Sequence, residues 1–322
     1  MTTRRWAVAL ASWLLLPSAL LQAASVSGPQ VLKGASTVPV RTPTRATPTA
    51  AAQAVWCKRL ALRLPGVTAA NCQSSNLQPS GALSNNGFPL LIRHIAPRVA
   101  NGKGLRVLVL GGIHGDELTA SAVVFKWLQW VQIPLAQEFT WDVVPVTNPD
   151  GLLAPKPTRV NARGVDLNRN FPTPDWQHEA PRYWAKVTAS DPRRFPGTGP
   201  LSEPETRWVN TEIDQFKPDV IVSVHAPFGV LDFDGPAPVP ERFGRLLFNR
   251  VGVYPGSLGN YSGRNRNIPV ITIELPNAQA MPSDLEVDRI WQDMLSWIKL
   301  NVHAQRDLMP SANSILPSTR IR

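Results

Sequence analysis

The segment LRVLVLGGIHGDE, residues 105–117, carries the strongest indication of the fold. Five of its first six residues are apolar, which is typical of a strand buried on both faces of a sheet. Two glycines end this strand, and a helix is expected from residue 117 to about 131. A buried strand that leads directly into a helix is the unit from which α/β sheets are built.

The same alternation continues along the chain. Further strands are expected at 139–146, 219–224 and 269–273, where apolar residues again run continuously. The chain therefore predicts a layered α/β domain, with helices between the strands.

Two of the expected helices can be bounded from their sequence. Ser202 and Glu205 have the spacing of a capping box, with Pro204 in the first turn, and predict a helix that runs to about residue 216. The final helix is expected at 283–302. Its core-facing side is expected to carry Leu285, Ile290, Met294, Trp297 and Ile298.

Three residues at strand ends have side chains suited to binding zinc. His114 and Glu117 form a His-x-x-Glu pattern after the first strand, and His225 follows the strand at 219–224. Turns beyond the carboxyl ends of strands are where open α/β sheets bind ligands. Two histidines and a carboxylate leave one position of a tetrahedral zinc ion open, as a hydrolase requires. Each histidine alone would more often be structural, so this prediction depends on the combination.

A cluster of arginine and asparagine residues occupies the segment TRVNARGVDLNRNFP, residues 158–172. Guanidinium and amide groups together can bind a carboxylate or a developing oxyanion. The alternative interpretation of this segment is a solvated basic loop.

Six segments, in this order, resemble the M14 zinc carboxypeptidase family. They are GGIHGDE (111–117), TNPDGL (147–152), RVNARGVDLNRNFP (159–172), GPLSEPETR (199–207), VSVHAPFG (222–229) and ITIELP (271–276). The resemblance implies a three-layer α/β domain in which helices flank a central mixed, mostly parallel sheet. Within the family, residues 222–236 and 256–263 are most similar to the murein tripeptide amidases. Those enzymes release diaminopimelate from the γ-D-glutamyl link of cell-wall peptides.

The resemblance also implies a metal centre and a general base. His114, Glu117 and His225 would hold one Zn²⁺, and Asp166 would accept a hydrogen bond from His114 and fix its tautomer. Glu274 would take a proton from the attacking water and return it to the leaving amine. As an alternative, Glu274 could be an exposed residue at a strand end.

Substrate-binding roles carry over to the arginine and asparagine cluster. Arg159 would polarise the scissile carbonyl, and Asn168 with Arg169 would bind the terminal carboxylate. Asn161, Asn148 and Glu205 are expected to be local scaffolding.

The family usually has a mobile tyrosine before the catalytic glutamate. Tyr254 and Tyr261 both lie upstream of Glu274, and Tyr254 is preferred because Tyr261 occupies a position often taken by a pocket-wall aromatic. Asn260 stands where carboxypeptidases often have an acidic residue, so the resemblance gives no charge for the specificity pocket.

The N-terminal third differs in composition from the rest of the chain. Residues 1–24 are typical of a secretory signal peptide, with an uncleaved anchor as the alternative. Residues 25–55 are expected to form a Pro/Thr/Ala-rich linker, 56–86 a basic extension, 87–304 the catalytic domain and 305–322 a tail. In an exported protein, Cys57 and Cys72 are expected to form a disulfide rather than remain free thiols. Periplasmic or secreted localisation without a stable membrane span is therefore predicted.

The positive charge is concentrated in the same region. No Asp or Glu precedes Asp116, whereas twelve Lys and Arg residues do, and the whole chain has a formal net charge of +10. Such a segment would be attracted to an anionic cell-wall polymer, or it could be a soluble extension without a partner. A nucleic-acid partner is not expected, because aromatic residues for base stacking are few.

These observations favour an exported zinc metallopeptidase of the murein peptide amidase type, acting on peptides derived from murein. Two enzyme alternatives remain: a general exported carboxypeptidase, and a deacylase of the aspartoacylase or succinylglutamate-desuccinylase kind. A non-catalytic wall-binding protein would be expected to lack a ligand or the base, and His114, Glu117, His225 and Glu274 are all present.

Overall fold

The computed structural model describes residues 50–98 and 104–302. The expected signal peptide and C-terminal tail lie outside these residues, as do residues 25–49 of the expected linker. Within the described ranges, no helix has both the length and the apolar character that crossing a membrane requires.

The described strands form a nine-stranded mixed sheet in the order β1-β2-β4-β3-β5-β9-β6-β8-β7. Their bounds are β1 Gln78–Leu83, β2 Pro89–Ile95, β3 Arg106–Gly111, β4 Thr140–Val144, β5 Val220–His225, β6 Val230–Asp234, β7 Arg242–Phe243, β8 Leu246–Phe248 and β9 Val270–Glu274. The central strands β4, β3, β5 and β9 are parallel, and β2 and β6 flank them in antiparallel orientation. The expected mixed sheet is confirmed.

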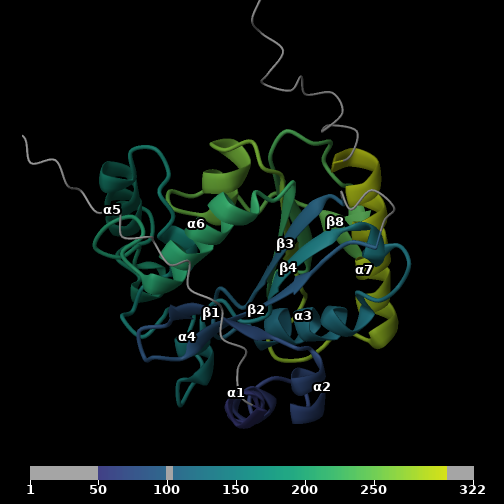
Figure 1. Ribbon diagram of the computed structural model, residues 1–322. Helices are drawn as coiled ribbons and strands as arrows, with labels where there is room; N and C mark the ends of the chain where they lie inside the picture. Colours follow the sequence, from purple (N-terminus) through teal and green to yellow (C-terminus); the bar gives the residue numbers. More distant parts are fainter. Residues whose placement is uncertain (1–49, 99–103, 303–322) are drawn as a thin grey trace, which may run out of the picture. The chain divides into compact units, whose positions relative to one another are not determined.

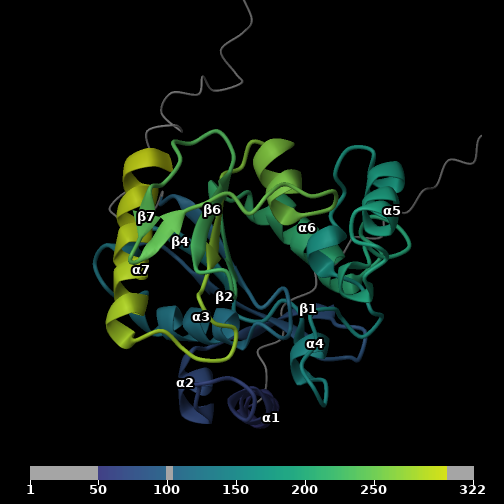
Figure 2. The same cartoon turned by 180° about the vertical axis from the view of Figure 1, so that it is seen from behind.

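Helices cover both faces of this sheet (Figures 1 and 2). They are α1 Ala50–Ala61, α2 Ala69–Ser74, α3 Leu118–Trp130, α4 Pro149–Leu153, α5 Trp176–Lys186, α6 Pro204–Phe216 and α7 Asp284–Trp297. One core joins a sheet face to α1, α3 and α7, and a second core joins the other face to α6. Short 3₁₀ turns lie at Ala136–Glu138, Leu167–Arg169 and Pro192–Arg194, and π turns at Gly259–Arg264 and Ile298–Val302.

The strands expected from continuous apolar runs are β3, β4, β5 and β9, each within two residues of its expected bounds. All six residues of β5 are buried, as expected for a strand with helices over both faces. Because the four strands are parallel, their carboxyl ends meet at one edge of the sheet. The loops that follow β3, β5 and β9 therefore lie together.

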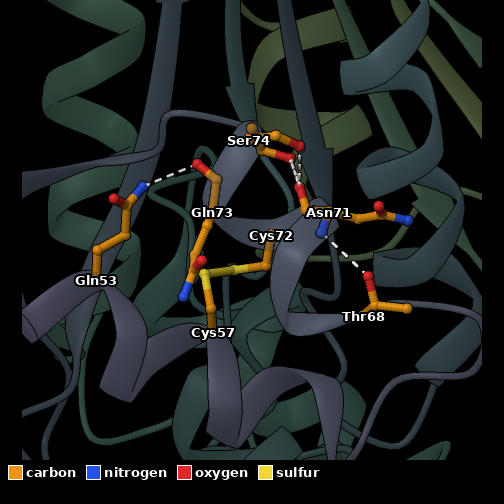
Figure 3. The surroundings of a disulfide bond; sticks show 8 residues. Gln53, Cys57, Thr68, Asn71, Cys72, Gln73 and Ser74 are labelled. Atoms are coloured by element: carbon orange, nitrogen blue, oxygen red, sulfur yellow. Dashed lines mark hydrogen bonds between the residues drawn. A yellow bond between two sulfur atoms is a disulfide. The ribbon is translucent and has the colours of Figure 1, made fainter. Parts of the chain in front are cut away.

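The disulfide expected between Cys57 and Cys72 is confirmed (Figure 3). The bond joins α1 to α2 with an S–S distance of 1.98 Å and a Cα–Cα distance of 5.4 Å, and both cysteines are buried. Beside it, Gln53 Nε2 donates a hydrogen bond to the carbonyl oxygen of Gln73 at 3.1 Å. The hydroxyl of Thr68 accepts from the backbone N–H of Asn71 and caps the start of α2.

Residues 56–86 pack into the same core as the helices and strands that follow them. Leu60, Leu64 and Leu77 are buried in the same core as α3 and α7. Strand β1 pairs with β2 at the edge of the sheet, so the boundary expected at residue 87 falls inside one hairpin. Helix α1 begins at Ala50, within the expected linker.

Two details of the expected helices were wrong. Leu285 is 59% exposed, because it lies five residues before Ile290 and points about 140° away from it around α7. The buried side of α7 begins with Val287 instead. Ser202 does not cap α6, since the capping position is Glu203, and the Ser202 hydroxyl hydrogen-bonds the Glu203 side chain at 2.8 Å.

Candidate active site

Three of the expected site residues meet at the carboxyl edge of the central strands. His114 lies in the turn after β3, Glu117 precedes α3, and His225 is the last residue of β5. All three side chains are buried, with at most 6% of each residue exposed. Strands β3 and β5 are neighbours in the sheet, which brings residues 111 positions apart in the chain into contact.

The donor atoms of these residues converge. Nδ1 of His114 lies 2.7 Å from one carboxylate oxygen of Glu117, and Nδ1 of His225 lies 3.0 Å from the other. The two Nδ1 atoms are 3.2 Å from each other, and one ligand atom from each of the three residues falls within 4.8 Å of the others. Burial opposes ionisation of Glu117, but the two imidazoles hold its pKa below the usual range.

Two further residues contact the Nε2 atoms of the two imidazoles and so orient the rings. Asp166 Oδ1 lies 3.1 Å from Nε2 of His114, and Ser223 Oγ lies 3.0 Å from Nε2 of His225. An ionised Asp166 only accepts, so Nε2 of His114 donates to it, while Nδ1 of His114 and Nδ1 of His225 both face the Glu117 carboxylate. Two ring nitrogens and a carboxylate that converge in this way can share a cation placed between them. The donor set therefore fits a zinc ion, which prefers nitrogen and carboxylate ligands.

Ser223 was not identified from the sequence. It lies two residues before His225 on β5, and alternate residues of a strand point to the same face. That spacing was the available signal.

Glu274 lies beside this centre. It ends β9 and is the register partner of His225 in the adjacent strand. The residue is 5% exposed, and its Oε2 has no hydrogen-bond partner among the described residues. Burial raises the pKa of this carboxyl above its usual value, the His225 imidazole opposes the shift, and the charge of Glu117 adds to it.

The expected oxyanion residue, Arg159, lies close to the same centre. Its Nε donates to Asp166 Oδ2 at 2.9 Å, and its Nη1 lies 3.6 Å from Glu117 Oε1. The side-chain amide of Asn148 donates to the carbonyl oxygen of Arg159 at 3.1 Å. These contacts fix the position of the Arg159 guanidinium beside the Glu117 carboxylate.

Asn168 and Arg169 lie on the 3₁₀ turn that follows Asp166. Arg169 is 4% exposed, and its Nε is buried without a hydrogen-bond partner among the described residues. Burial lowers the pKa of this guanidinium. The side-chain oxygen of Asn168 accepts from the backbone N–H of Leu258 at 2.8 Å, which leaves its NH₂ group as the donor for a ligand. A buried cation with an unused donor is suited to binding a carboxylate.

The two tyrosines differ in their surroundings. The Tyr254 ring lies 4.3 Å from the guanidinium carbon of Arg169, and its hydroxyl donates to the carbonyl oxygen of Val251 at 2.8 Å. Tyr261 instead stacks on Phe171 in the second core. Of the two, only Tyr254 lines the cavity described next.

These side chains surround one cavity of about 990 Å³. His114, Glu117, His225 and Glu274 lie on its wall together with the substrate-binding candidates Arg159, Asn168, Arg169 and Tyr254. Several charged residues that were not expected from the sequence also line it. They are Asp116, Lys156, Arg193, Arg194, Asp232, Asp234 and Arg250.

A buried acidic group supports the loop that carries Arg159. Asn161 Nδ2 donates to Glu203 at 2.8 Å and to Glu205 at 3.2 Å, and its Oδ1 accepts from the backbone of Arg163 and Val165. Oε1 of Glu205 has no partner among the described residues. Burial, with smaller contributions from Asp150 and Glu203, raises the pKa of Glu205 to about 7. Glu205 therefore holds a proton in the folded protein at slightly acid pH.

This shift predicts a pH-dependent stability. Between the unfolded pKa and about 7, the folded protein binds a proton that the unfolded chain has released, so the free energy of unfolding falls as pH rises. The full loss attributable to Glu205 is roughly 3 kcal/mol above pH 7. Glu205→Gln is expected to remove this slope, and Glu241→Gln, at an exposed position, to retain it. Urea unfolding at a series of pH values from 5 to 8 gives the free energy of unfolding at each pH. The same dependence on pH in wild type and Glu205→Gln would contradict the assignment.

The chain is similar in sequence and in fold to zinc carboxypeptidases and murein peptide amidases. A family model described as zinc carboxypeptidase matches residues 80–231. The chain is 33% identical to murein peptide amidase A of Vibrio campbellii over 211 residues, which are 63% of this chain and 79% of that protein. It is also 33% identical to murein peptide amidase A of Escherichia coli K12 over 197 residues, 59% and 77% of the two chains. The structure is also similar to that of bovine thrombin-activatable fibrinolysis inhibitor in complex with a tick carboxypeptidase inhibitor. The superposition includes 79% of this chain and 95% of the bovine chain, with a TM-score of 0.54 and 17% sequence identity. That likeness shows the fold.

Proposed function

The chain belongs to the M14 zinc carboxypeptidase family. On this basis we propose that it is an exported zinc enzyme, and that it hydrolyses the γ-D-glutamyl-diaminopimelate bond of murein-derived peptides. The observation that carries the proposal is the convergence of His114, Glu117 and His225 in a cavity that Glu274 and Arg169 also line. The two relatives named murein peptide amidase A support the class of substrate.

His114, Glu117 and His225 would hold the zinc ion. When bound, the metal would supply Lewis-acid polarisation and a more acidic water molecule. Asp166 and Ser223 keep the two imidazoles in the orientation that this requires, through their contacts with the Nε2 atoms.

Glu274 would act as general base and then general acid. Its carboxylate accepts a proton from the attacking water and returns it to the nitrogen of the leaving diaminopimelate. A raised pKa suits this role, because a base close to neutrality can both take and release a proton. The free Oε2 is available for that proton, since no described residue hydrogen-bonds it.

The arginines would bind the substrate's oxygen atoms. Arg159 lies next to Glu117 and would stabilise negative charge that develops on the scissile carbonyl. Arg169 and Asn168 would bind the free terminal carboxylate, with the Tyr254 ring against the Arg169 guanidinium. These contacts favour cleavage of the last residue of a peptide.

Export is supported by the signal-like sequence at 1–24 and by the buried disulfide, which forms in oxidising compartments. The basic residues before Asp116 would keep the enzyme near the anionic cell wall. Release of ordinary C-terminal residues remains the second candidate activity, since the Arg169 site would accept any terminal carboxylate.

The metal assignment predicts one tightly bound zinc ion per chain. His225→Ala is expected to weaken zinc affinity more than Asp166→Asn, for which about 10- to 100-fold is expected. Zinc content after dialysis against a graded chelator, measured by plasma mass spectrometry, tests this.

Two controls separate this site from the other histidines of the described residues, His94 and His178. His94, Asp142 and Glu212 form another group of possible ligands, in which His94 is exposed, and His178 is exposed on α5. His94→Ala and His178→Ala are both expected to keep the bound zinc. Loss of zinc from His94→Ala but not from His225→Ala would contradict the assignment.

A further inference from the structure

The wall of the cavity next to Glu274 is built by β6 and β9, which pair in antiparallel orientation. In this register Val230 lies opposite Glu274, and Asp232 lies opposite Thr272. All four line the cavity, because alternate residues of paired strands point to the same face. Asp232 therefore lies two residues, about 7 Å, further along β6 than Val230, which is opposite Glu274.

Asp232 is a buried carboxylate without a cationic partner. The residue is 4% exposed, and its oxygens accept from the backbone N–H groups of Phe233 at 2.8 Å and Val251 at 3.1 Å. None of the ion pairs among the described residues includes Asp232; the nearby arginines Arg264 and Arg266 pair with Asp234 and Asp214 instead. A buried charge is unfavourable unless it is paired, so this carboxylate is suited to binding a cation that enters the cavity.

Asp234, the next acidic residue on the same face, is different. Arg264 Nε lies 3.2 Å from its Oδ1. Gly259 and Gly263 pack so closely against Asp234 that a Cβ at either would clash with it. Its charge is already compensated, which leaves Asp232 as the acceptor for a substrate cation.

We propose that Asp232 selects the substrate by binding an ammonium group on the side chain of the residue that hydrolysis releases. This inference rests on the proposed function, in which that residue is diaminopimelate, whose second centre carries an ammonium and a carboxylate. Asn260, at the position where carboxypeptidases often have an acidic residue, is neutral, and its side-chain amide donates to the Tyr254 carbonyl oxygen at 3.1 Å. Asp232 supplies the negative charge from β6 instead.

A pair of matched substrates tests this selection. One is L-Ala-γ-D-Glu-diaminopimelate; the other replaces diaminopimelate with 2-aminopimelate, which keeps the distal carboxylate and lacks the distal amine. Zinc-loaded wild type is expected to prefer the first by about 30-fold or more in kcat/KM. Asp232→Asn is expected to remove the preference by lowering kcat/KM for the diaminopimelate peptide alone. Asp234→Asn removes an equal charge two residues away and is expected to keep the preference, because Asp234 is paired with Arg264.

The outcomes separate this inference from the proposed function. Equal cleavage of both peptides by wild type, or an equal loss on both in Asp232→Asn, would overturn the role of Asp232 and leave the amidase activity standing. If wild type cleaves neither peptide, the proposed function fails, and calorimetric titration with free diaminopimelate and 2-aminopimelate decides on Asp232. Tighter binding of diaminopimelate to wild type, lost in Asp232→Asn, supports the inference; equal affinities overturn it.

Discussion

Glu274→Gln is expected to lower kcat by about 10³-fold while the protein keeps its zinc and its melting temperature. Glutamine has nearly the same shape, but its amide cannot take a proton from water at neutral pH. The carboxylate lies beside His225, is buried, and has an oxygen that no described residue hydrogen-bonds. Removing its charge should therefore affect the reaction far more than the fold.

Steady-state kinetics, zinc analysis and a thermal melt on the same preparation test this expectation. Glu179→Gln, at a half-exposed position of α5 where Glu179 pairs with Arg182, provides a control and is expected to keep wild-type turnover. Turnover retained within a few-fold in Glu274→Gln would remove Glu274 from the mechanism. If Glu274→Gln lost its zinc as well as its turnover, Glu274 would be needed to maintain the metal site.

Arg169→Gln is expected to lower kcat/KM about 10³-fold for peptides with a free terminal carboxylate, chiefly through KM. Arg169 is buried, its Nε is unpaired, and its guanidinium lies against the Tyr254 ring. A substrate carboxylate would satisfy this donor and the positive charge together. A peptide with an amidated terminus cannot do so, and its already slow cleavage should change little.

The comparison of free and amidated peptides separates carboxylate binding from structural damage. Arg193→Gln is the control, because Arg193 lines the same cavity but is 58% exposed in its side chain and ion-paired with Asp116. It is expected to have a small effect on both peptides. An equal loss on both peptides in Arg169→Gln would show that Arg169 maintains the site rather than binding the carboxylate.

The centre of the fold could be predicted from the sequence because burial on both faces leaves a clear signal. β3, β5 and β9 are short, continuous apolar runs, and their parallel order brings His114, His225 and Glu274 to one edge. The confirmed disulfide followed from the expectation of export, since Cys57 and Cys72 are the two cysteines of the chain.

The N-terminal region was harder to predict because its apolar residues do not form a regular pattern. Strand β1, QPSGAL, contains proline and glycine and has no buried position, so it gave no strand signal, yet it pairs with β2. Leu60, Leu64 and Leu77 enter the main core through contacts that no local pattern reveals. The packing of residues 56–86 against the main core therefore could not be predicted from the sequence.

The sequence also could not predict which side chains face the cavity where this depends on how two strands pair. Asp232 faces the cavity because β6 pairs with β9 with Val230 opposite Glu274, and a shift by one residue would turn it away. Leu285 shows the opposite case: it is apolar, but its angle around α7 points it to solvent.

The most direct test of the proposed activity incubates zinc-loaded wild type with L-Ala-γ-D-Glu-diaminopimelate and with a panel of ordinary peptides. Glu274→Gln serves as the blank, and the products are identified by mass. The predicted result is free diaminopimelate and L-Ala-D-Glu, with little release from the ordinary peptides and none above background in the blank. Release of ordinary C-terminal residues without release of diaminopimelate would contradict the murein amidase assignment and indicate a general carboxypeptidase.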